Sequence, residues 1–242
     1  MATFVLVHGA WHGSWCWKRV RKALQAEGQE VFTPTLTGVG ERSHLRAPQV
    51  NLDTHIDDIV NLIRWEELSD VVLCGHSYGG CVVSGVADRI PDRIGKLVYL
   101  DAFVLHDGES LHSTLPPDQR NLQIELTRQH GEGWKVPPIP GEVFGVNSND
   151  RDWMNRQCTV QPLATFQQAI TLKGSAATIA TTFILASGWN DSPFPLFDER
   201  AKAKGWRTLS IPCGHDVMLD RPEELTRTLL EVAARPSNQA TV

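Results

Sequence analysis

The stretch "VVLCGHSYGG", residues 71–80, runs from four apolar residues into a serine held between glycines. A Gly-x-Ser-x-Gly pattern is centred on Ser77, and the apolar run before it predicts a buried strand that turns directly into a helix. A turn this tight crowds the backbone around the serine, and only glycine lacks the Cβ that would clash there. The pattern predicts a nucleophilic Ser77 at a helix N-terminus. A serine that merely caps the helix is the alternative.

The composition is that of an ordinary globular protein, and the length fits one large domain or two small ones. The 242 residues are 41% hydrophobic and 21% charged, with a net charge of −5. Because there is no Lys/Arg-rich run, we expect neither nucleic acid nor a membrane as a partner. The apolar runs are too short for a signal peptide or a membrane span, which predicts a cytoplasmic protein. Five scattered cysteines without Cys-x-x-Cys spacing argue against a disulfide framework or a zinc site.

Short β-rich runs alternate with longer amphipathic runs along most of the chain. The predicted strands are residues 3–9, 30–36, 70–75, 96–103, 181–187 and 207–214. The predicted helices are residues 17–28, 52–68, 78–90, 195–205 and 222–234. Continuous apolar strands separated by helices indicate the α/β class, with a doubly wound, mainly parallel sheet covered on both faces.

The rhythm changes between residues 104 and 177, where prolines cluster and polar helical pieces appear. We predict that residues 1–103 and 178–236 form the core and that 104–177 form a mostly helical cap inserted after the fourth predicted strand. Such a cap would cover the carboxyl ends of the strands, where open α/β sheets bind ligands. An independent small domain is the alternative, and the weak apolar periodicity counts against it. Residues 237–242 are expected to form a flexible tail.

A serine hydroxyl is a weak nucleophile, so Ser77 needs a histidine base and an acid that orients it. Among nine histidines, His215 in "CGHDVM" follows the last predicted strand and precedes the final helix, where the order serine, acid, histidine puts the base. Asp191, in "ASGWNDSPF" after the fifth predicted strand, is the acid that we favour. Asp101, at the end of the fourth predicted strand, is the alternative, because some folds supply the acid from the strand after the nucleophile.

The loop after the first strand reads "HGAWHGSW" and is expected to aim a backbone N–H into the site. We assign the oxyanion hole to the N–H groups of Ala10 and Tyr78, the latter being the residue after the nucleophile. His8 and His12 raise metal binding as an alternative. The glycines around them indicate a loop, and no carboxylate companion is apparent in the sequence. We therefore expect no metal and no cofactor.

Tryptophan is abundant, with eight residues against two tyrosines. Trp11, Trp134 and Trp153 are candidate walls of an apolar substrate pocket, because aromatic side chains of this size often line such pockets. Packing in the core is an equally weighted alternative for each of them.

Three segments carry a family likeness: "FVLVHGAWHGSWCW" at 4–17, "GHSYGG" at 75–80 and "GHDVMLDRPEEL" at 214–225. They resemble the α/β-hydrolase superfamily, in the compact branch that holds plant methylesterases and hydroxynitrile lyases. Bacterial members of this branch include esterases that degrade pyrethroid and carbamate pesticides. The resemblance spans the chain outside the middle segment and implies the α/β-hydrolase fold.

The resemblance also implies an activity. The expected protein is a serine hydrolase of small aromatic carboxylic or carbamic esters, methyl esters and methyl carbamates among them, that acts through an acyl-enzyme. Carried over residue by residue, the nucleophile falls on Ser77, the base on His215, the acid on Asp191 and the oxyanion donors on Ala10 and Tyr78. The implied partner is a small-molecule ester or carbamate, and a homodimer is an open option.

Two other functions on the same fold stay as alternatives. The lyase branch resembles a site with a threonine after His-Gly-Ala and a lysine after the catalytic histidine, where this chain has Trp11 and Asp216. Without a cation beside the histidine, a leaving cyanide is poorly stabilised. A non-catalytic receptor for a small hormone-like ligand is the second alternative, and the complete set of serine, histidine and acid counts against it.

Overall fold

The computed structural model describes residues 1–235, and in these residues six parallel strands form a central sheet. Their order across the sheet is β2-β1-β3-β4-β7-β8, with every neighbouring pair parallel. The strands are β1 (Thr3–Val7), β2 (Glu30–Phe32), β3 (Val71–His76), β4 (Ile94–Leu100), β7 (Ala180–Ala186) and β8 (Arg207–Ile211). The predicted parallel sheet is confirmed. The tail predicted at 237–242 and residue 236 of the predicted core lie outside the described residues.

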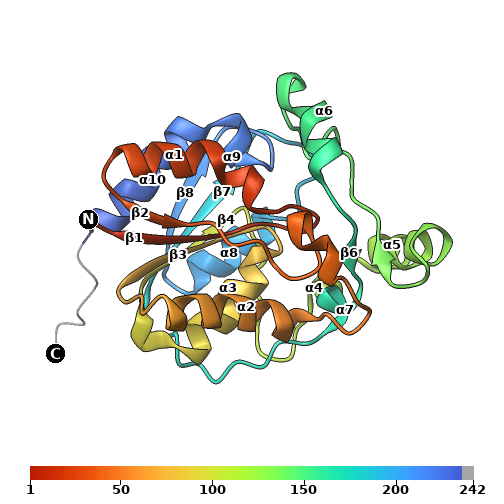
Figure 1. Cartoon of the computed structure of the whole chain (residues 1–242), viewed down its shortest axis with the longest axis horizontal. Coiled ribbons are helices and arrows are strands. Elements are labelled where there is room, and N and C mark those ends of the chain that lie inside the picture. Colours follow the sequence, from red (N-terminus) through yellow and green to blue (C-terminus); the bar gives the residue numbers. More distant parts are fainter. Residues whose placement is uncertain (236–242) are drawn as a thin grey trace.

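Helices cover both faces of this sheet (Figure 1). One face carries α1 (Lys18–Ala26), α9 (Val217–Asp220) and α10 (Pro222–Ala234). The other carries α2 (Leu52–Trp65), α3 (Gly79–Arg89) and α8 (Pro195–Ala203). Three short 3-10 turns are η1 (Ser14–Trp17), η2 (Gly40–Leu45) and η3 (Pro91–Arg93). The sheet is therefore buried on both sides, which explains why its strands read as continuous apolar runs.

Local sequence signals set the helix ends. The chain leaves α1 at Gly28, whose φ of 72° is a left-handed conformation that glycine adopts without steric cost. Helix α2 begins at Asn51, whose side chain accepts a hydrogen bond from the N–H of Thr54 at 3.0 Å and completes a capping box. The apolar residues whose spacing predicts this helix are all buried: Ile56, Ile59, Val60 and Ile63.

The segment between β4 and β7 contains α4 (Leu111–Thr114), α5 (Pro117–His130), β5 (Lys135–Val136), α6 (Ser148–Gln157), β6 (Gln161–Pro162) and α7 (Ala164–Gln167). These helices and short strands lie beyond the carboxyl ends of the sheet strands, at the right of Figure 1, and the chain after α7 then runs back to the start of β7. The predicted helical insertion after the fourth strand is confirmed, with an unpredicted antiparallel pair of β5 and β6. Its limits at 104 and 177 remain predictions. Among the described helices, none combines the length and apolar character needed to cross a bilayer.

Buried histidines tie loops to the strand ends. His8 Nδ1 donates to the Gly9 carbonyl at 2.7 Å, and its Nε2 accepts the Leu36 N–H at 3.0 Å. His55 Nε2 donates to the Thr37 carbonyl at 2.8 Å, so its Nδ1 accepts the Tyr78 hydroxyl at 2.9 Å. Both rings are therefore neutral. Burial lowers the pKa of His8 to about 3 and that of His55 to about 4.

The neutral His55 predicts a pH dependence of stability. The unfolded chain takes up a proton on this residue near pH 6.5, whereas the folded chain does so only near pH 4. Between these values the unfolded state binds more protons, so the free energy of unfolding falls on acidification by up to about 1.4 kcal/mol per pH unit. His55→Gln keeps groups that can replace both hydrogen bonds and should flatten this slope. Urea unfolding at several pH values measures it, and equal slopes for the two proteins would contradict a neutral His55.

Candidate active site

The turn between β3 and α3 holds Ser77 in a strained conformation. Its φ is 54°, in the left-handed region that non-glycine residues rarely occupy. The neighbouring backbone leaves no room for a side chain, since a Cβ on Gly75 would lie 2.5 Å from the carbonyl oxygen of Gly79. The strand before and helix after this turn agree with the sequence prediction, and Ser77 is 9% exposed.

The loop after β1 lies directly against this turn. A Cβ on Gly9 would lie 2.9 Å from the Cβ of Ser77. Ala10 follows it, and Tyr78 follows the serine, both buried. Within the described residues, neither the Ala10 N–H nor the Tyr78 N–H has a hydrogen-bond partner. The two predicted oxyanion donors are therefore available to a ligand at the serine.

His215 is held by Asp101. Its Nδ1 lies 2.6 Å from Asp101 Oδ2, and the two side chains are 3% and 0% exposed. The other carboxylate oxygen accepts the Ala186 N–H at 3.0 Å. Burial raises the pKa of Asp101 above its usual value, although the His215 hydrogen bond opposes that rise. With the Nδ1 proton directed at Asp101, the Nε2 lone pair of His215 is free to accept a proton.

The prediction that Asp191 orients His215 is wrong on this geometry. Asp191 lies in the turn before α8 with a φ of 61°, its side chain is exposed, and no hydrogen bond of the described residues involves it. Asp101, the alternative from the end of β4, occupies the position instead. Strands β4 and β7 are neighbours in the sheet, so either could have supplied the acid, and the direction of the turn decides between them.

His76 directly precedes Ser77 in the chain and contacts His215. Its ring lies 4.4 Å from the His215 ring between centroids, and its Nε2 donates to the His215 carbonyl at 3.1 Å. Burial holds the pKa of His76 well below its ordinary value, so this ring is neutral. No hydrogen bond joins Ser77 to His215 among the described residues, and catalytic contacts of this kind often tighten only with substrate. Sequence reasoning did not anticipate His76 as a site residue.

Aromatic rings surround the His215 imidazole. Phe194 stacks on it with centroids 4.9 Å apart and planes 8° apart. Phe144 and Trp189 contact it at centroid distances of 5.1 and 5.2 Å. The Phe144 carbonyl also accepts the His215 N–H at 2.9 Å, which ties the inserted segment to the base. These three rings escaped the sequence analysis, because nothing in their local sequence distinguishes them from core residues.

The predicted pocket tryptophans occupy different places. Trp11 is buried and packs against Phe144 at 6.2 Å and Phe166 at 5.8 Å, so it belongs to the ring cluster around the site. Trp153 packs edge-on against Trp15, and Trp134 lies under the Lys135 ammonium. Among the ring contacts of residues 1–235, none joins Trp134 or Trp153 to His215. Their role as pocket walls remains a prediction.

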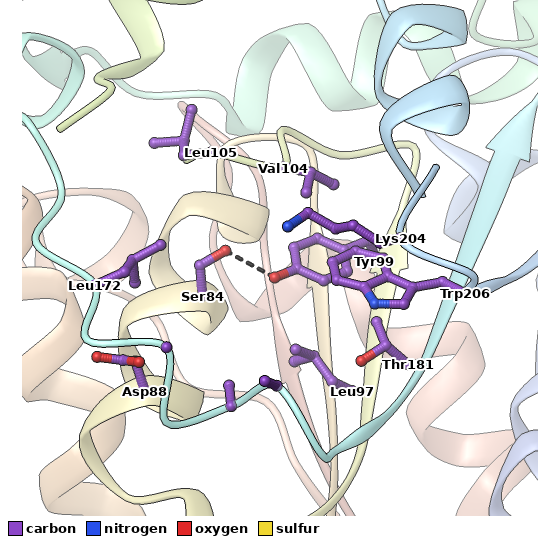
Figure 2. A pocket seen from close by; sticks show the side chains of 13 residues that line it. Ser84, Asp88, Leu97, Tyr99, Val104, Leu105, Leu172, Thr181, Lys204 and Trp206 are labelled. Carbon is purple, nitrogen blue, oxygen red and sulfur yellow. Dashed lines mark hydrogen bonds between the residues drawn. The ribbon is translucent and has the colours of Figure 1, made fainter. Parts of the chain in front are cut away.

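A separate cavity of about 310 Å³ opens between α3, β4, β7 and the end of α8 (Figure 2). The rings of Tyr99 and Trp206 stack in its wall at 5.2 Å. The Ser84 hydroxyl donates to the Gly80 carbonyl and accepts the Tyr99 hydroxyl at 2.8 Å, the bond drawn in Figure 2. Its lining contains none of the predicted site residues, so this cavity is distinct from the serine and histidine.

The residues around Ser77 supply three groups that can act in a reaction. A strained serine lies at a helix N-terminus, a buried histidine is oriented by a carboxylate, and the N–H groups of Ala10 and Tyr78 have no hydrogen-bond partner among the described residues. These groups are what nucleophilic acyl transfer requires.

Comparisons with known proteins agree with this fold. The model of the Alpha/beta hydrolase family matches residues 4–228. A carbendazim hydrolyzing esterase from Nocardioides sp. (strain SG-4G) is 47% identical over 241 residues, which are 95% of this chain and 98% of the relative. An extracellular alpha/beta-hydrolase from a Paenibacillus species has a TM-score of 0.86 at 21% identity, covering 97% of this chain and all of its own. A pyrethroid hydrolase from Sphingobium faniae JZ-2 has a TM-score of 0.77 at 24% identity, covering 97% and 98%. Both solved structures share the fold.

The glycine before the turn provides a stability test. Gly75→Ala places a methyl group against the Gly79 carbonyl, which is backbone and cannot move aside, so we expect a loss of roughly 1–3 kcal/mol in the free energy of unfolding. Gly141→Ala is the matched control, because its Cβ meets a flexible side chain, Met154 Sδ, at 3.0 Å. Urea unfolding of both variants makes the measurement. Equal stabilities of the two would contradict the steric account of the turn.

Proposed function

This chain belongs to the alpha/beta hydrolase family and is an ester hydrolase, and we propose that it cleaves small aromatic carboxylic or carbamic esters with Ser77 as the nucleophile. The observation that carries the proposal is the buried hydrogen bond of 2.6 Å between Asp101 and His215, next to a strained serine. Asp101 replaces Asp191 as the acid in this proposal, whereas Ser77, His215, Ala10 and Tyr78 keep their expected roles.

In the first half of the reaction, Ser77 Oγ attacks the ester carbonyl carbon while His215 Nε2 takes the serine proton. Asp101 keeps the imidazole in the tautomer with Nδ1 protonated and stabilises the imidazolium that forms. The carbonyl oxygen becomes an oxyanion, which accepts hydrogen bonds from the Ala10 and Tyr78 N–H groups. His215 then returns the proton to the leaving group, and an acyl-enzyme or carbamoyl-enzyme is left on Ser77.

In the second half, a water molecule takes the place of the serine. His215 removes a proton from this water as its oxygen attacks the acyl carbon, and the same two N–H groups hold the second oxyanion. Collapse of the intermediate returns the proton to Ser77 Oγ and releases the acid. A carbamate substrate releases a carbamic acid in this step.

The aromatic preference is supported by the rings around the base. Phe144, Trp189 and Phe194 contact His215, and Trp11 extends the cluster, so a flat apolar group beside the serine meets ring faces and edges. The relative from Nocardioides is named for carbendazim, an aromatic methyl carbamate. We therefore infer aryl methyl esters and aryl methyl carbamates as the substrate class to test first.

A fluorophosphonate probe tests the nucleophile. Wild-type protein should acquire one phosphonyl group on Ser77, because the activated hydroxyl attacks phosphorus as it attacks a carbonyl carbon. Ser77→Ala should remain unlabelled and hydrolyse neither aryl esters nor methyl carbamates. Intact-protein mass spectrometry and a hydrolysis assay measure both results. An unlabelled wild-type protein would support the receptor alternative, and cyanide release from a cyanohydrin would support the lyase.

Paired substitutions test the acid. Asp101→Asn should lower kcat by roughly 10⁴-fold, because the amide favours the wrong histidine tautomer. Asp191→Asn is the matched control and should change kcat little, since that carboxylate is exposed. Burial already raises the pKa of Asp101, so the neutral amide should be tolerated by the fold, as circular dichroism can verify. A crippling Asp191→Asn beside a mild Asp101→Asn would reverse the assignment.

A further inference from the structure

A second buried histidine–aspartate pair lies beside the first. His12 Nε2 is 3.1 Å from Asp216 Oδ1, and the side chains are 2% and 0% exposed. Asp216 directly follows His215 in the chain, whereas His12 belongs to the loop after β1. The pair thus joins the loop that carries the proposed base to the loop that carries a proposed oxyanion donor.

The pair is charged. His12 Nδ1 donates its proton to the Ala10 carbonyl at 2.7 Å, and the other ring nitrogen, Nε2, faces Asp216. In the ion pair both ring nitrogens of His12 carry a proton. Burial favours the neutral imidazole, but the charge of Asp216 raises the pKa of His12 above its usual value. Burial likewise opposes the charge of Asp216, and His12 nevertheless holds the pKa of this carboxyl below its usual range. In the described part of the chain, neither His12 Nε2 nor either carboxylate oxygen of Asp216 has a hydrogen-bond partner, so the contact of 3.1 Å is held as an ion pair.

Packing fixes the pair on the remaining sides. Trp15 stacks on the His12 ring at 4.9 Å and 21°, and Trp153 packs edge-on against Trp15 at 5.1 Å. The His76 ring lies 6.2 Å from His12 and 4.4 Å from His215 between centroids, so one imidazole contacts both histidines. The Asp216 carbonyl accepts the N–H groups of Leu219 and Asp220, which anchors the residue to the start of α9.

We propose that His12 and Asp216 are positioning residues for ester hydrolysis: their ion pair holds the Ala10 N–H in place for the oxyanion relative to His215. The inference rests on the proposed function, because it takes the Ala10 N–H as an oxyanion donor and His215 as the base. The His12 ring binds the Ala10 carbonyl through Nδ1, and Asp216 contacts the opposite nitrogen of the same ring, Nε2. Neither residue touches the reacting atoms.

Asp216→Asn breaks the ion pair without leaving a lone charge, because His12 can lose its extra proton. His12→Asn/Asp216→Asn removes both charges, and an asparagine amide can still donate to the Ala10 carbonyl from about the position of His12 Nδ1. Both variants should lower kcat by roughly 10- to 100-fold with little change in KM, as loss of an interaction made only in the transition state does. Asp88→Asn is the matched control, since this buried carboxylate bonds the N–H groups of Lys173 and Ser175 on another part of the fold.

Two readouts separate positioning from a merely structural role. The kcat is expressed per site titrated with the fluorophosphonate probe, so that unfolded protein is not counted. The preference for an aryl ester over its thiono analogue should fall in both variants, because an aligned N–H stabilises an oxyanion better than a thiolate-like sulfur. Asp88→Asn should keep both the kcat and this preference.

A kcat per titrated site within about twofold of wild type in the double variant would overturn the proposal, as would an unchanged preference for the oxygen ester. Loss of the folded circular dichroism spectrum in both variants would make the pair a requirement of the fold and would also overturn the proposal.

Ser77→Ala, assayed in parallel, distinguishes failure of this proposal from failure of the proposed function. If Ser77→Ala stays active, the proposed function fails, whereas an inactive Ser77→Ala beside a fully active double variant removes only the role of the ion pair.

Discussion

The rest of the site depends on one steric constraint, the tight turn that holds Ser77 between β3 and α3. The turn passes from β3 into α3 with φ at 54°, and the Gly75 and Gly79 backbones approach so closely that no Cβ fits on Gly75. Gly9 then brings the loop after β1 within contact of the serine, and the Ser77 carbonyl accepts the N–H of Phe103 at 3.2 Å. Three loops at the carboxyl ends of neighbouring strands thus meet at one residue. Strain of this kind persists only where the surroundings over-determine it.

Buried charge is the second feature of the site. Asp101 and Asp216 are both 0% exposed, and each faces a histidine within 3.1 Å. Isolated carboxylates at these positions would cost several kcal/mol, so each is tolerated because an imidazole compensates it. The same low dielectric strengthens every interaction with an oxyanion formed beside them. The neutral ring of His76 contacts the histidines of both pairs, His12 and His215.

The sequence predicted those site residues whose positions depend only on the few residues around them. Ser77 and His215 follow from a strand, a turn and a helix that can be read within a few residues, and the sheet follows from the apolar runs. The acid could not be settled in this way, because Asp101 and Asp191 both follow strands, and β4 and β7 are neighbours. Only the three-dimensional course of the turns separates a buried carboxylate from an exposed one. Asp216 was likewise invisible as the companion of His12, because the two lie at opposite ends of the chain.

The position of the acid also explains the aromatic character of the site. Because the carboxylate that binds His215 comes from the end of β4, among the described residues the loop after β7 supplies no hydrogen-bond partner to the His215 side chain. This loop supplies aromatic rings instead. Trp189 and Phe194 come from this loop, and they pack on the imidazole that Asp101 orients. Stacked rings restrict the imidazole from one side while the hydrogen bond restricts it from another. The loop after β7 does contain a carboxylate, Asp191, but it is exposed to solvent, so the rings of this loop and not its acid pack against the base. A second buried carboxylate at this imidazole would have needed polar partners of its own, which the rings do not offer.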